Sequence, residues 1–342
     1  MKLQVVLLWF SLALAAPAFA QSAAPPVAAP DNRQEMFAAL TRANAAVVGV
    51  QVTATDGARS AESLGRRRAG SGVVIGDDGL VLTIGYLMLE ADAIQIVTQD
   101  NKTVPARAVA YDLATGFGLL RPLLPISGIA PVPLGSGTSV ANGAPLLAAI
   151  GGQGGGVAIT QLVGQRAFSG YWEYHIDGAL FTSPPVGNHS GAPLFNERGE
   201  LLGIGSLFVG NALGDERRVP GNMFVPVDLL KPILAEMQQT GSTRQSRRPW
   251  LGLTSSEQAG RVQVVRVAKD SPAESAGLRP GDVVLAIDNT QVATLEAFYK
   301  ALWAHPNPDD EITLMVLQDQ QIKSIVVKAV DRMTTVTKPP GI

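Results

Sequence analysis

The chain has 342 residues, which is enough for two domains. Hydrophobic residues make up 46% and charged residues 16%, with 36 Gly and 23 Pro, a mixture typical of short strands joined by many turns. The formal net charge is −2, so the overall charge favours neither nucleic acid nor an anionic membrane as a partner. Two short basic runs, residues 66–68 and 247–248, lie among Gly, Ser and Gln and are predicted to be solvated loops.

Residues 1–20 have the features of a secretory signal peptide. Lys2 precedes an apolar run over residues 5–15, and Ala18-Phe19-Ala20 has the small-x-small pattern of a signal peptidase site. The apolar run is short for a membrane span, and no later segment reaches about 18 uninterrupted apolar residues. We therefore expect cleavage after Ala20 and a periplasmic protein without a membrane span, in keeping with the absence of cysteine. A retained N-terminal anchor is the alternative.

The next segment, residues 21–34, is rich in Ala and Pro and is predicted to be a disordered linker. A short helix is expected from residue 35, after a polar cap. From residue 46 onward the pattern changes to short runs rich in Val and Ile, separated by Gly, Pro and Asp. This spacing predicts a mainly β domain over residues 35–240, a barrel or sandwich, which ends in a helix over residues 227–239.

A polar stretch without an apolar period, residues 241–248, is predicted to be a linker to a second domain over residues 249–332. In this domain, strand-like runs alternate with two short helices, the longer of them over residues 295–304. Residues 333–342 are rich in Thr and Pro and are predicted to be a flexible tail. The predicted organisation is therefore a β domain followed by a smaller α+β domain.

Residues 187–193 (GNHSGAP) resemble the nucleophile loop of trypsin-like serine proteases, which has the form G-x-S-G-G-P and places its serine at Ser190. Residues 82–87 (LTIGYL) stand where these enzymes carry their catalytic histidine, and Tyr86 occupies the histidine position. Residues 115–120 (TGFGLL) stand where the motif T-D-L-A-L-L is usual, and Gly116 occupies the aspartate position. The loop therefore resembles a protease site that lacks both partners of its serine.

Further segments make the resemblance specific. Residues 70–83 (GSGVVIGDDGLVLT) are similar to the segment before the histidine in the HtrA/Deg family of periplasmic serine proteases, and residues 134–151 resemble a later segment of that domain. Residues 271–284 (SPAESAGLRPGDVV) are similar to the PDZ signature of the same family. Over residues 35–331 the chain resembles this family, which implies a chymotrypsin-type double β-barrel followed by a PDZ domain.

Tyr86 precedes Gly116 by 30 residues, and Gly116 precedes Ser190 by 74. These are about the intervals that the order histidine–aspartate–serine has in the family, so the mismatches are interpreted as substitutions in place. Asp112 does not supply the missing carboxylate, because the family carries its own non-catalytic aspartate at that point of the motif. The resemblance thus places the catalytic positions at Tyr86, Gly116 and Ser190, with Asn188 in the oxyanion loop.

A serine hydroxyl is a poor nucleophile unless a base takes its proton. The phenol of Tyr86 has an ordinary pKa of about 10 and keeps its proton at neutral pH, and Gly116 has no side chain that could orient a base. We therefore expect Ser190 to be proteolytically inactive and its loop to be retained as a tight turn. The residue two before the serine is normally glycine, and Asn188 reaches the required backbone conformation less readily, so the oxyanion hole is also expected to be impaired.

The three histidines do not form an alternative catalytic centre in the sequence. His189 is adjacent to Ser190 and is expected to point away from it, while His175, on a strand predicted over residues 171–176, and His305 are expected to be structural or exposed. No H-E-x-x-H motif occurs, so no metal site is predicted, and no cofactor is expected.

The PDZ part offers a peptide-binding site. PDZ domains add an extended peptide to a sheet edge and capture its terminal carboxylate with the backbone N–H groups of a short loop. The resemblance therefore implies protein C-termini or unfolded polypeptides as partners. The predicted peptide-binding residues are Trp250, Leu251, Gly252 and Leu253 in the loop, with Phe298 and Leu302 on the apolar face of the helix.

Three functions remain open on the sequence. The first is a catalytically degenerate HtrA-like protein that binds peptides as an adaptor or chaperone in the cell envelope. The second is an active or weakly active serine endopeptidase of protein quality control, in which an unrecognised base assists Ser190. The third is a regulatory subunit of mixed trimers with active relatives. The family forms trimers through the start of its protease domain, which implies a homotrimer or mixed trimer here with Phe37 as a candidate contact.

Overall fold

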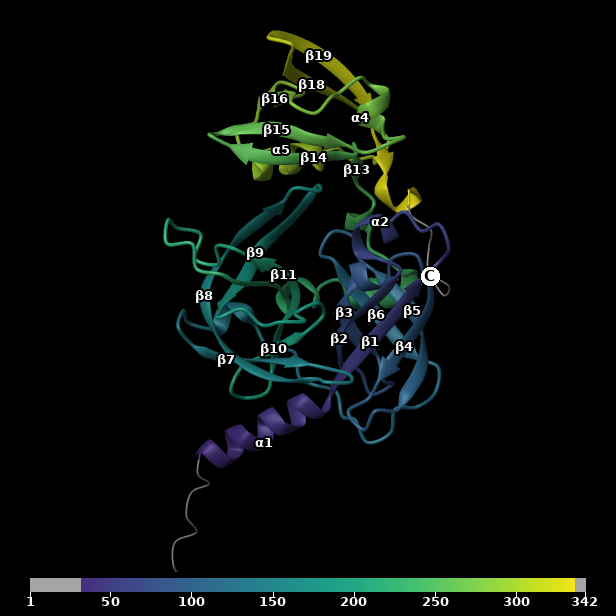
Figure 1. Cartoon of the computed structure of the whole chain (residues 1–342), viewed down its shortest axis with the longest axis vertical. Helices are drawn as coiled ribbons and strands as arrows, with labels where there is room; N and C mark the ends of the chain where they lie inside the picture. The colour runs from purple at the N-terminus through teal and green to yellow at the C-terminus, as the bar shows by residue number, and fades with distance from the viewer. Residues whose placement is uncertain (1–31, 336–342) are drawn as a thin grey trace, which may run out of the picture.

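The computed structural model describes residues 32–335, which form two closed β-barrels and a smaller third unit (Figure 1). The predicted fold, a chymotrypsin-type double barrel followed by a PDZ domain, is confirmed. The signal peptide predicted over residues 1–20, and residues 21–31 of the predicted linker, lie outside the described part of the chain. Within residues 32–335, no helix is long and apolar enough to cross a membrane.

The first barrel has the closed strand order β1-β2-β3-β6-β5-β4. Its strands are rich in β-branched residues, which suit a pleated sheet, and the side chains that point inward, such as those of Val50, Leu82 and Leu119, are almost fully buried. The strands are β1 (Val47–Ala54), β2 (Arg67–Val74), β3 (Val81–Ile84), β4 (Ala91–Val97), β5 (Thr103–Tyr111) and β6 (Phe117–Pro122).

The second barrel is closed in the order β10-β11-β12-β9-β8-β7. Its β8–β9 hairpin extends from the barrel up to the third unit (Figure 1). The strand predicted over residues 171–176 starts later than expected, because residues 171–173 form the turn of this hairpin. The strands are β7 (Pro145–Ile150), β8 (Gly156–Gly170), β9 (Tyr174–Ser183), β10 (Pro193–Phe195), β11 (Leu201–Val209) and β12 (Gly221–Pro226).

The third unit contains a sheet in the order β14-β15-β16-β18-β19, so β14 lies at its edge. The helix α5 (Leu295–Leu302), which begins at an N-cap formed by Thr294, packs on the core of this unit. The other elements are β13 (Pro249–Trp250), β14 (Leu253–Gln258), β15 (Arg261–Val267), α4 (Pro272–Ser275), β16 (Val283–Ile287), β17 (Thr290–Gln291), β18 (Glu311–Gln318), β19 (Gln321–Lys328) and β20 (Val330–Asp331).

Two helices differ from their predicted extents. Helix α1 (Asn32–Ala45) begins inside the predicted linker and is longer than the short helix expected from residue 35. The helix predicted over residues 227–239 is instead a 3-10 turn, η3 (Val227–Leu229), followed by the short helix α3 (Leu234–Thr240). The remaining short helices are α2 (Ala61–Leu64), η1 (Gly85–Met88), η2 (Gly137–Ser139), η4 (Arg244–Ser246) and η5 (Arg332–Thr334).

The segment predicted to be a free linker, residues 241–248, is fixed to the first barrel. The hydroxyls of Thr243 and Ser246 are buried, and both donate to the carboxylate of Asp112. Asp112 also accepts from the backbone N–H of Thr115 at 2.9 Å. The polar residues of this segment therefore form buried hydrogen bonds, and the segment is not the free linker that its composition predicted. Of the predicted flexible tail, residues 336–342 lie outside the described range, whereas Arg332–Thr334 form η5.

The prediction that both basic runs are solvated is wrong for Arg68 and Arg248. Arg68 is buried on β2, and its guanidinium donates to the backbone carbonyls of Tyr86 at 3.2 Å and Leu89 at 2.7 Å. Arg248 lies with its guanidinium carbon 3.6 Å from the ring centroid of Trp303, at the boundary between barrel and PDZ unit. Both arginines thus hold backbone or aromatic partners in place.

Candidate active site and peptide-binding groove

Tyr86 and Ser190 meet in the cleft between the barrels. Tyr86 lies in η1, directly after β3, and Ser190 lies in the loop between β9 and β10. The phenolic oxygen of Tyr86 is 2.7 Å from the hydroxyl oxygen of Ser190 and 2.9 Å from the backbone carbonyl oxygen of Ser206. Tyr86, which the sequence predicts to replace the catalytic histidine, therefore contacts the serine as a catalytic base would have to.

The hydrogen-bond pattern of Tyr86 is not that of a base. A neutral phenol has one proton to donate, and the carbonyl of Ser206 can only accept. The phenol is within donating distance of both the Ser190 hydroxyl and the Ser206 carbonyl, and it can give its single proton to only one of them. In either arrangement the phenolic oxygen keeps its own proton, and a neutral phenol is too weakly basic to remove the proton of Ser190 during an attack.

The surroundings of Tyr86 also oppose its ionisation. Burial raises the pKa of the Tyr86 phenol to about 12, and the hydrogen bond from Ser190 offsets this only in part. At pH 7 a phenol with such a pKa is ionised to roughly one part in 10⁵. Tyr86 is therefore a neutral hydrogen-bonding group at this position.

Gly116 leaves the aspartate position without a carboxylate. Its backbone is left-handed, with φ +84°, and its carbonyl accepts from the backbone N–H of Gly85 at 2.7 Å. A Cβ atom added here would lie 3.2 Å from the phenolic oxygen of Tyr174, which itself donates to the carbonyl of Thr115 at 3.0 Å. The space beside η1 is thus occupied by a second tyrosine, and Asp112 is engaged with Thr115 and the segment 241–248 as described above.

The loop around Ser190 is fixed against β2. The carbonyl of Ser190 accepts from the backbone N–H of Ser71 at 2.9 Å, and a Cβ at Gly191, which has φ +74°, would lie 2.0 Å from the carbonyl oxygen of Ser71. Asn188 has φ +51°, so it does adopt the left-handed conformation that the sequence argument regarded as unfavourable. Asparagine is among the residues that tolerate this region best, which explains the outcome.

None of the histidines approaches the serine as a base would. The imidazole of His189 is hydrogen-bonded to the backbone carbonyl of Val186, and burial lowers its pKa. His175 is bonded to Ser169 at 2.9 Å and to Asp177 at 3.1 Å, and His305 is 2.7 Å from Asp288.

His175 also lies in the one group of potential metal ligands found among the described residues. His175, Asp177 and Glu296 offer ligand atoms that all lie within 4.8 Å of one another. The ammonium group of Lys300 is 2.6 Å from Glu296 and 3.6 Å from Asp177, so a protein cation already offsets part of the negative charge of this group.

The predicted carboxylate-binding loop of the PDZ unit holds a carboxylate from the same chain. The backbone N–H groups of Leu251, Gly252 and Leu253 donate to the side-chain carboxylate of Glu173, at 3.2, 2.8 and 2.8 Å. Glu173 lies in the turn of the β8–β9 hairpin and is 7% exposed. Sequence reasoning missed Glu173, because an isolated glutamate in a turn between two strands carries no signal of a distant partner.

Two backbone contacts accompany this carboxylate. The backbone N–H of Ser255, on the edge strand β14, donates to the carbonyl of Tyr171 at 2.8 Å. The hydroxyl of Tyr299, on α5, donates to the carbonyl of Gly170 at 2.7 Å and lies 3.2 Å from the backbone nitrogen of Glu173. The hairpin turn therefore contacts both sides of the groove between β14 and α5.

The predicted groove residues on the helix, Phe298 and Leu302, are fully buried beside Tyr299 in the core cluster of the PDZ unit. Among these three, Tyr299 is hydrogen-bonded to the hairpin turn, and the sequence prediction did not include it. The assignment of Phe298 and Leu302 to the groove stays a prediction. Trp250 is half-buried, and the guanidinium of Arg332 lies 4.4 Å from its ring centroid.

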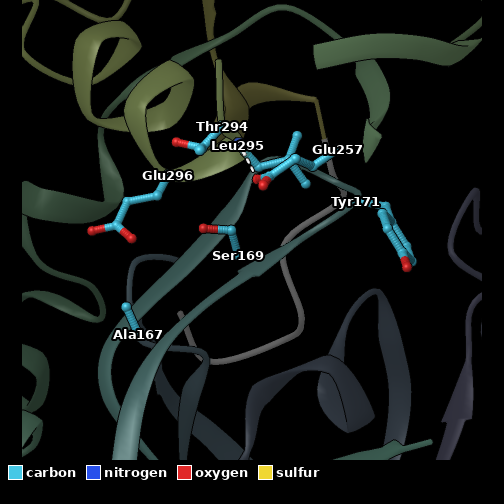
Figure 2. A pocket seen from close by; sticks show the side chains of 7 residues that line it. All are labelled: Ala167, Ser169, Tyr171, Glu257, Thr294, Leu295 and Glu296. Carbon is cyan, nitrogen blue, oxygen red and sulfur yellow. Dashed lines mark hydrogen bonds between the residues drawn. The ribbon is translucent and has the colours of Figure 1, made fainter. Parts of the chain in front are cut away.

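The groove continues beyond the hairpin turn as a cavity of about 370 Å³. Figure 2 shows α5 on one side of this cavity and the hairpin on the other, with Glu257 bonded to the backbone N–H of Leu295 at 3.0 Å. The lining residues are Ala167, Ser169, Tyr171, Glu257, Thr294, Leu295 and Glu296.

Comparison with known families agrees with this geometry. Residues 70–204 match a trypsin-like peptidase domain, and residues 249–329 match a PDZ domain. The chain has the domain arrangement of the HtrA/Deg family. Similar solved structures include an HtrA-type protease AlgW with tripeptide, at TM-score 0.55 and 20% identity, which covers 89% of this chain and 98% of that one. A serine endoprotease from Yersinia pestis has TM-score 0.52 and 22% identity over 86% and 97% of the two chains.

Curated relatives of this HtrA/Deg-like chain are serine proteases by name. The serine endoprotease DegS of Haemophilus influenzae is 26% identical, over 75% of this chain and 76% of that protein. A probable periplasmic serine endoprotease DegP-like of Halomonas elongata is 27% identical over 78% of this chain, which spans only 57% of the relative. The mitochondrial serine protease HTRA2 of Drosophila pseudoobscura pseudoobscura is 27% identical, over 72% and 62% of the two chains.

Proposed function

We propose that this HtrA/Deg-like chain is proteolytically inactive and acts as a peptide-binding adaptor or chaperone in the cell envelope. The observation that carries the proposal is the phenol of Tyr86, which is hydrogen-bonded to Ser190 in the position of the base and keeps its own proton at neutral pH. Loss of the base from a serine protease triad costs roughly 10⁶-fold in turnover, and removal of further triad members adds little. Residual oxyanion-hole catalysis of roughly 10³–10⁴ over water would be too slow for protein turnover.

The binding part of the proposal rests on the PDZ unit. The loop Leu251–Gly252–Leu253 presents three backbone N–H groups to one carboxylate, which is the chemistry needed to hold a protein C-terminus. The edge of β14 offers further main-chain donors and acceptors to an added strand. Protein C-termini and unfolded polypeptides are therefore the partner class that we propose.

Location and assembly follow from the same resemblance. DegP-like relatives are named periplasmic, and we propose the same compartment for this chain after cleavage at Ala20. Phe37, on α1, is 73% exposed, which favours a contact with other copies or with active relatives in a homotrimer or mixed trimer. Such an assembly would let a catalytically inactive subunit regulate an active one.

The inactivity is tested with a fluorophosphonate probe and with casein on the purified mature protein. We expect no labelling and no cleavage that differs from those of the Ser190→Ala variant, because the serine has no base. Labelling or turnover that disappears in Ser190→Ala, at a level comparable to an active HtrA protease, would instead establish the serine endopeptidase alternative.

A further inference from the structure

The turn of the β8–β9 hairpin occupies the place where a PDZ domain holds its ligand. Its carboxylate lies in the carboxylate-binding loop, and its backbone is bonded to the edge strand beside that loop. We propose that residues 170–174 are an internal ligand of the PDZ groove, so that an external peptide binds only after this turn has left. The consequence for external peptides rests on the peptide-binding function proposed above.

The turn contacts the groove through its backbone and one carboxylate. Residues 171–173 form a turn, and Glu173 has a left-handed backbone, so the turn contacts β14 through a single backbone hydrogen bond rather than by continuing its sheet. The carbonyl of Tyr171 and the carboxylate of Glu173 both accept hydrogen bonds from the PDZ unit. The ring of Trp172, between them in the chain, stacks on Tyr174 at a centroid distance of 5.7 Å. Trp172 and Tyr171 are 48% and 59% exposed, so backbone and carboxylate groups carry the contact rather than these side chains.

The internal carboxylate and an external one exclude each other. Each backbone N–H of Leu251, Gly252 and Leu253 has a single hydrogen, and all three hydrogens are directed at Glu173. The N–H of Ser255 is committed to Tyr171 in the same way. A peptide that used these donors would therefore have to displace the turn. Two carboxylates within one small loop would also repel each other.

The docked turn carries costs that make it displaceable. Glu173 has φ +57°, a left-handed backbone that is uncommon for residues other than Gly, Asn and Asp. Its carboxylate is removed from water, and burial raises its pKa although the three N–H donors and the cation of Arg332 oppose the shift. A contact that combines favourable hydrogen bonds with backbone strain and a buried charge is suited to reversible occupation.

The size of the effect follows from the occupied fraction. A ligand that binds only the open groove has an apparent dissociation constant equal to its intrinsic value divided by the open fraction. If the turn is docked in nine molecules of ten or more, removal of the docked state should tighten external binding by about 10-fold or more.

The test uses the full mature chain and the variant Glu173→Ala, which removes the acceptor oxygens that the three backbone N–H groups bind. The control is Asp92→Ala, the same truncation of a carboxylate at an exposed position on β4 of the first barrel. The probe is a fluorescein-labelled octapeptide, Gly-Ser-Gly-Ser-Ala-Leu-Leu-Val, with either a free or an amidated C-terminus. Amide hydrogen exchange of residues 251–255 provides a second measurement that requires no ligand.

We expect Glu173→Ala to bind the free-acid peptide about 10-fold more tightly than the native chain. We also expect its amides over residues 251–255 to exchange at least about 10-fold faster. Asp92→Ala should match the native chain in both. The variant Tyr299→Phe, which removes the hydroxyl bonded to Gly170, should change both quantities in the same direction by less. Unchanged exchange and unchanged affinity in Glu173→Ala would overturn the internal ligand.

Failure of the proposed peptide-binding function has a different signature. If Glu173→Ala bound free-acid and amidated peptides equally, the loop would not recognise a terminal carboxylate, whatever the exchange data gave. Faster exchange together with that result would leave the docked turn standing and remove the adaptor function.

Discussion

Side chains of the protein itself fill both the barrel cleft and the PDZ groove, but the two sites differ in which functional groups they retain. In the cleft, Tyr86 and Tyr174 occupy the space, and the base and carboxylate that catalysis needs are replaced. In the groove, Glu173 occupies the loop, and every backbone donor that binding needs is present. Removal of the occupant should therefore restore binding in the groove, whereas it cannot restore catalysis in the cleft.

The difference between the cleft and the groove would disappear if catalysis were easily restored. We expect the double variant Tyr86→His with Gly116→Asp to show at most a trace of Ser190-dependent casein cleavage. An aspartate at position 116 must adopt φ +84°, which costs about 1–2 kcal/mol for a residue with a Cβ, and this Cβ would lie 3.2 Å from the phenolic oxygen of Tyr174.

The further change Tyr174→Phe removes the crowding hydroxyl and should raise kcat/KM of the double variant by about 10-fold, equivalent to about 1.4 kcal/mol. The same variants with Ser190→Ala are the controls. If the double variant alone were as active as an intact HtrA protease, the catalytic architecture of the cleft would be intact, and its side chains would merely fill it, as Glu173 fills the groove.

A second variant tests how firmly the two regions are joined. Asp112→Ala should leave the buried hydroxyls of Thr243 and Ser246 without their acceptor, and we expect a loss of about 3 kcal/mol in the free energy of unfolding. Urea denaturation measures this loss, and Asp92→Ala, at an exposed site, should stay within about 0.5 kcal/mol of the native chain. An Asp112→Ala midpoint equal to that of the control would mean that the segment 241–248 is not held by this carboxylate.

The smallest expected effect is the pH dependence of the groove. Because burial raises the pKa of Glu173, the docked turn holds a proton more tightly than the released turn does. Lowering the pH through the raised pKa should therefore favour docking, and the effect should level off below the ordinary value for glutamic acid, about 4.3. The charged or titratable groups that contribute beside it are Arg332 on η5, Tyr299 on α5 and Arg248.

Peptide affinity measured for the native chain and for Glu173→Ala isolates this contribution, since the titration of the peptide itself is common to both. The dissociation constant of the native chain divided by that of Glu173→Ala should grow as the pH falls from neutral toward the ordinary pKa of glutamic acid, about 4.3. A ratio that shrinks over this range would show that the backbone donors outweigh burial and that Glu173 docks as an ion that resists protonation.

Short β-branched runs and glycine-rich turns predicted a β domain, because these signals are local. The double barrel, the PDZ domain and the positions of Tyr86, Gly116 and Ser190 followed from the resemblance of short motifs to the HtrA/Deg family. The structure brings Tyr86 and Ser190 into contact. Helical periodicity gives one apolar face of α5 without saying which neighbour covers each residue. It therefore gave no reason to select Tyr299, which lies in the same core cluster as Phe298 and is bonded to the hairpin through its hydroxyl.

Glu173 could not be found in the same way. It lies 78 to 80 residues before the N–H groups that it binds, and those groups belong to the backbone, which is the same for almost every residue type. The hydroxyls of residues 243 and 246 had no signal either, because Thr and Ser are equally common in solvated loops and in buried hydrogen bonds.

The fixed segment 241–248 determines where motion can occur in this molecule. A domain joined by a slack tether can swing aside as a rigid body, and its hinge then absorbs the movement. Here the connecting segment is fastened to Asp112 at one end, and Arg248 lies over Trp303 at the other, so the PDZ unit has no hinge at its entrance. The freedom to open the groove is left to the β8–β9 ribbon, which makes the hairpin, rather than the domain, the moving part.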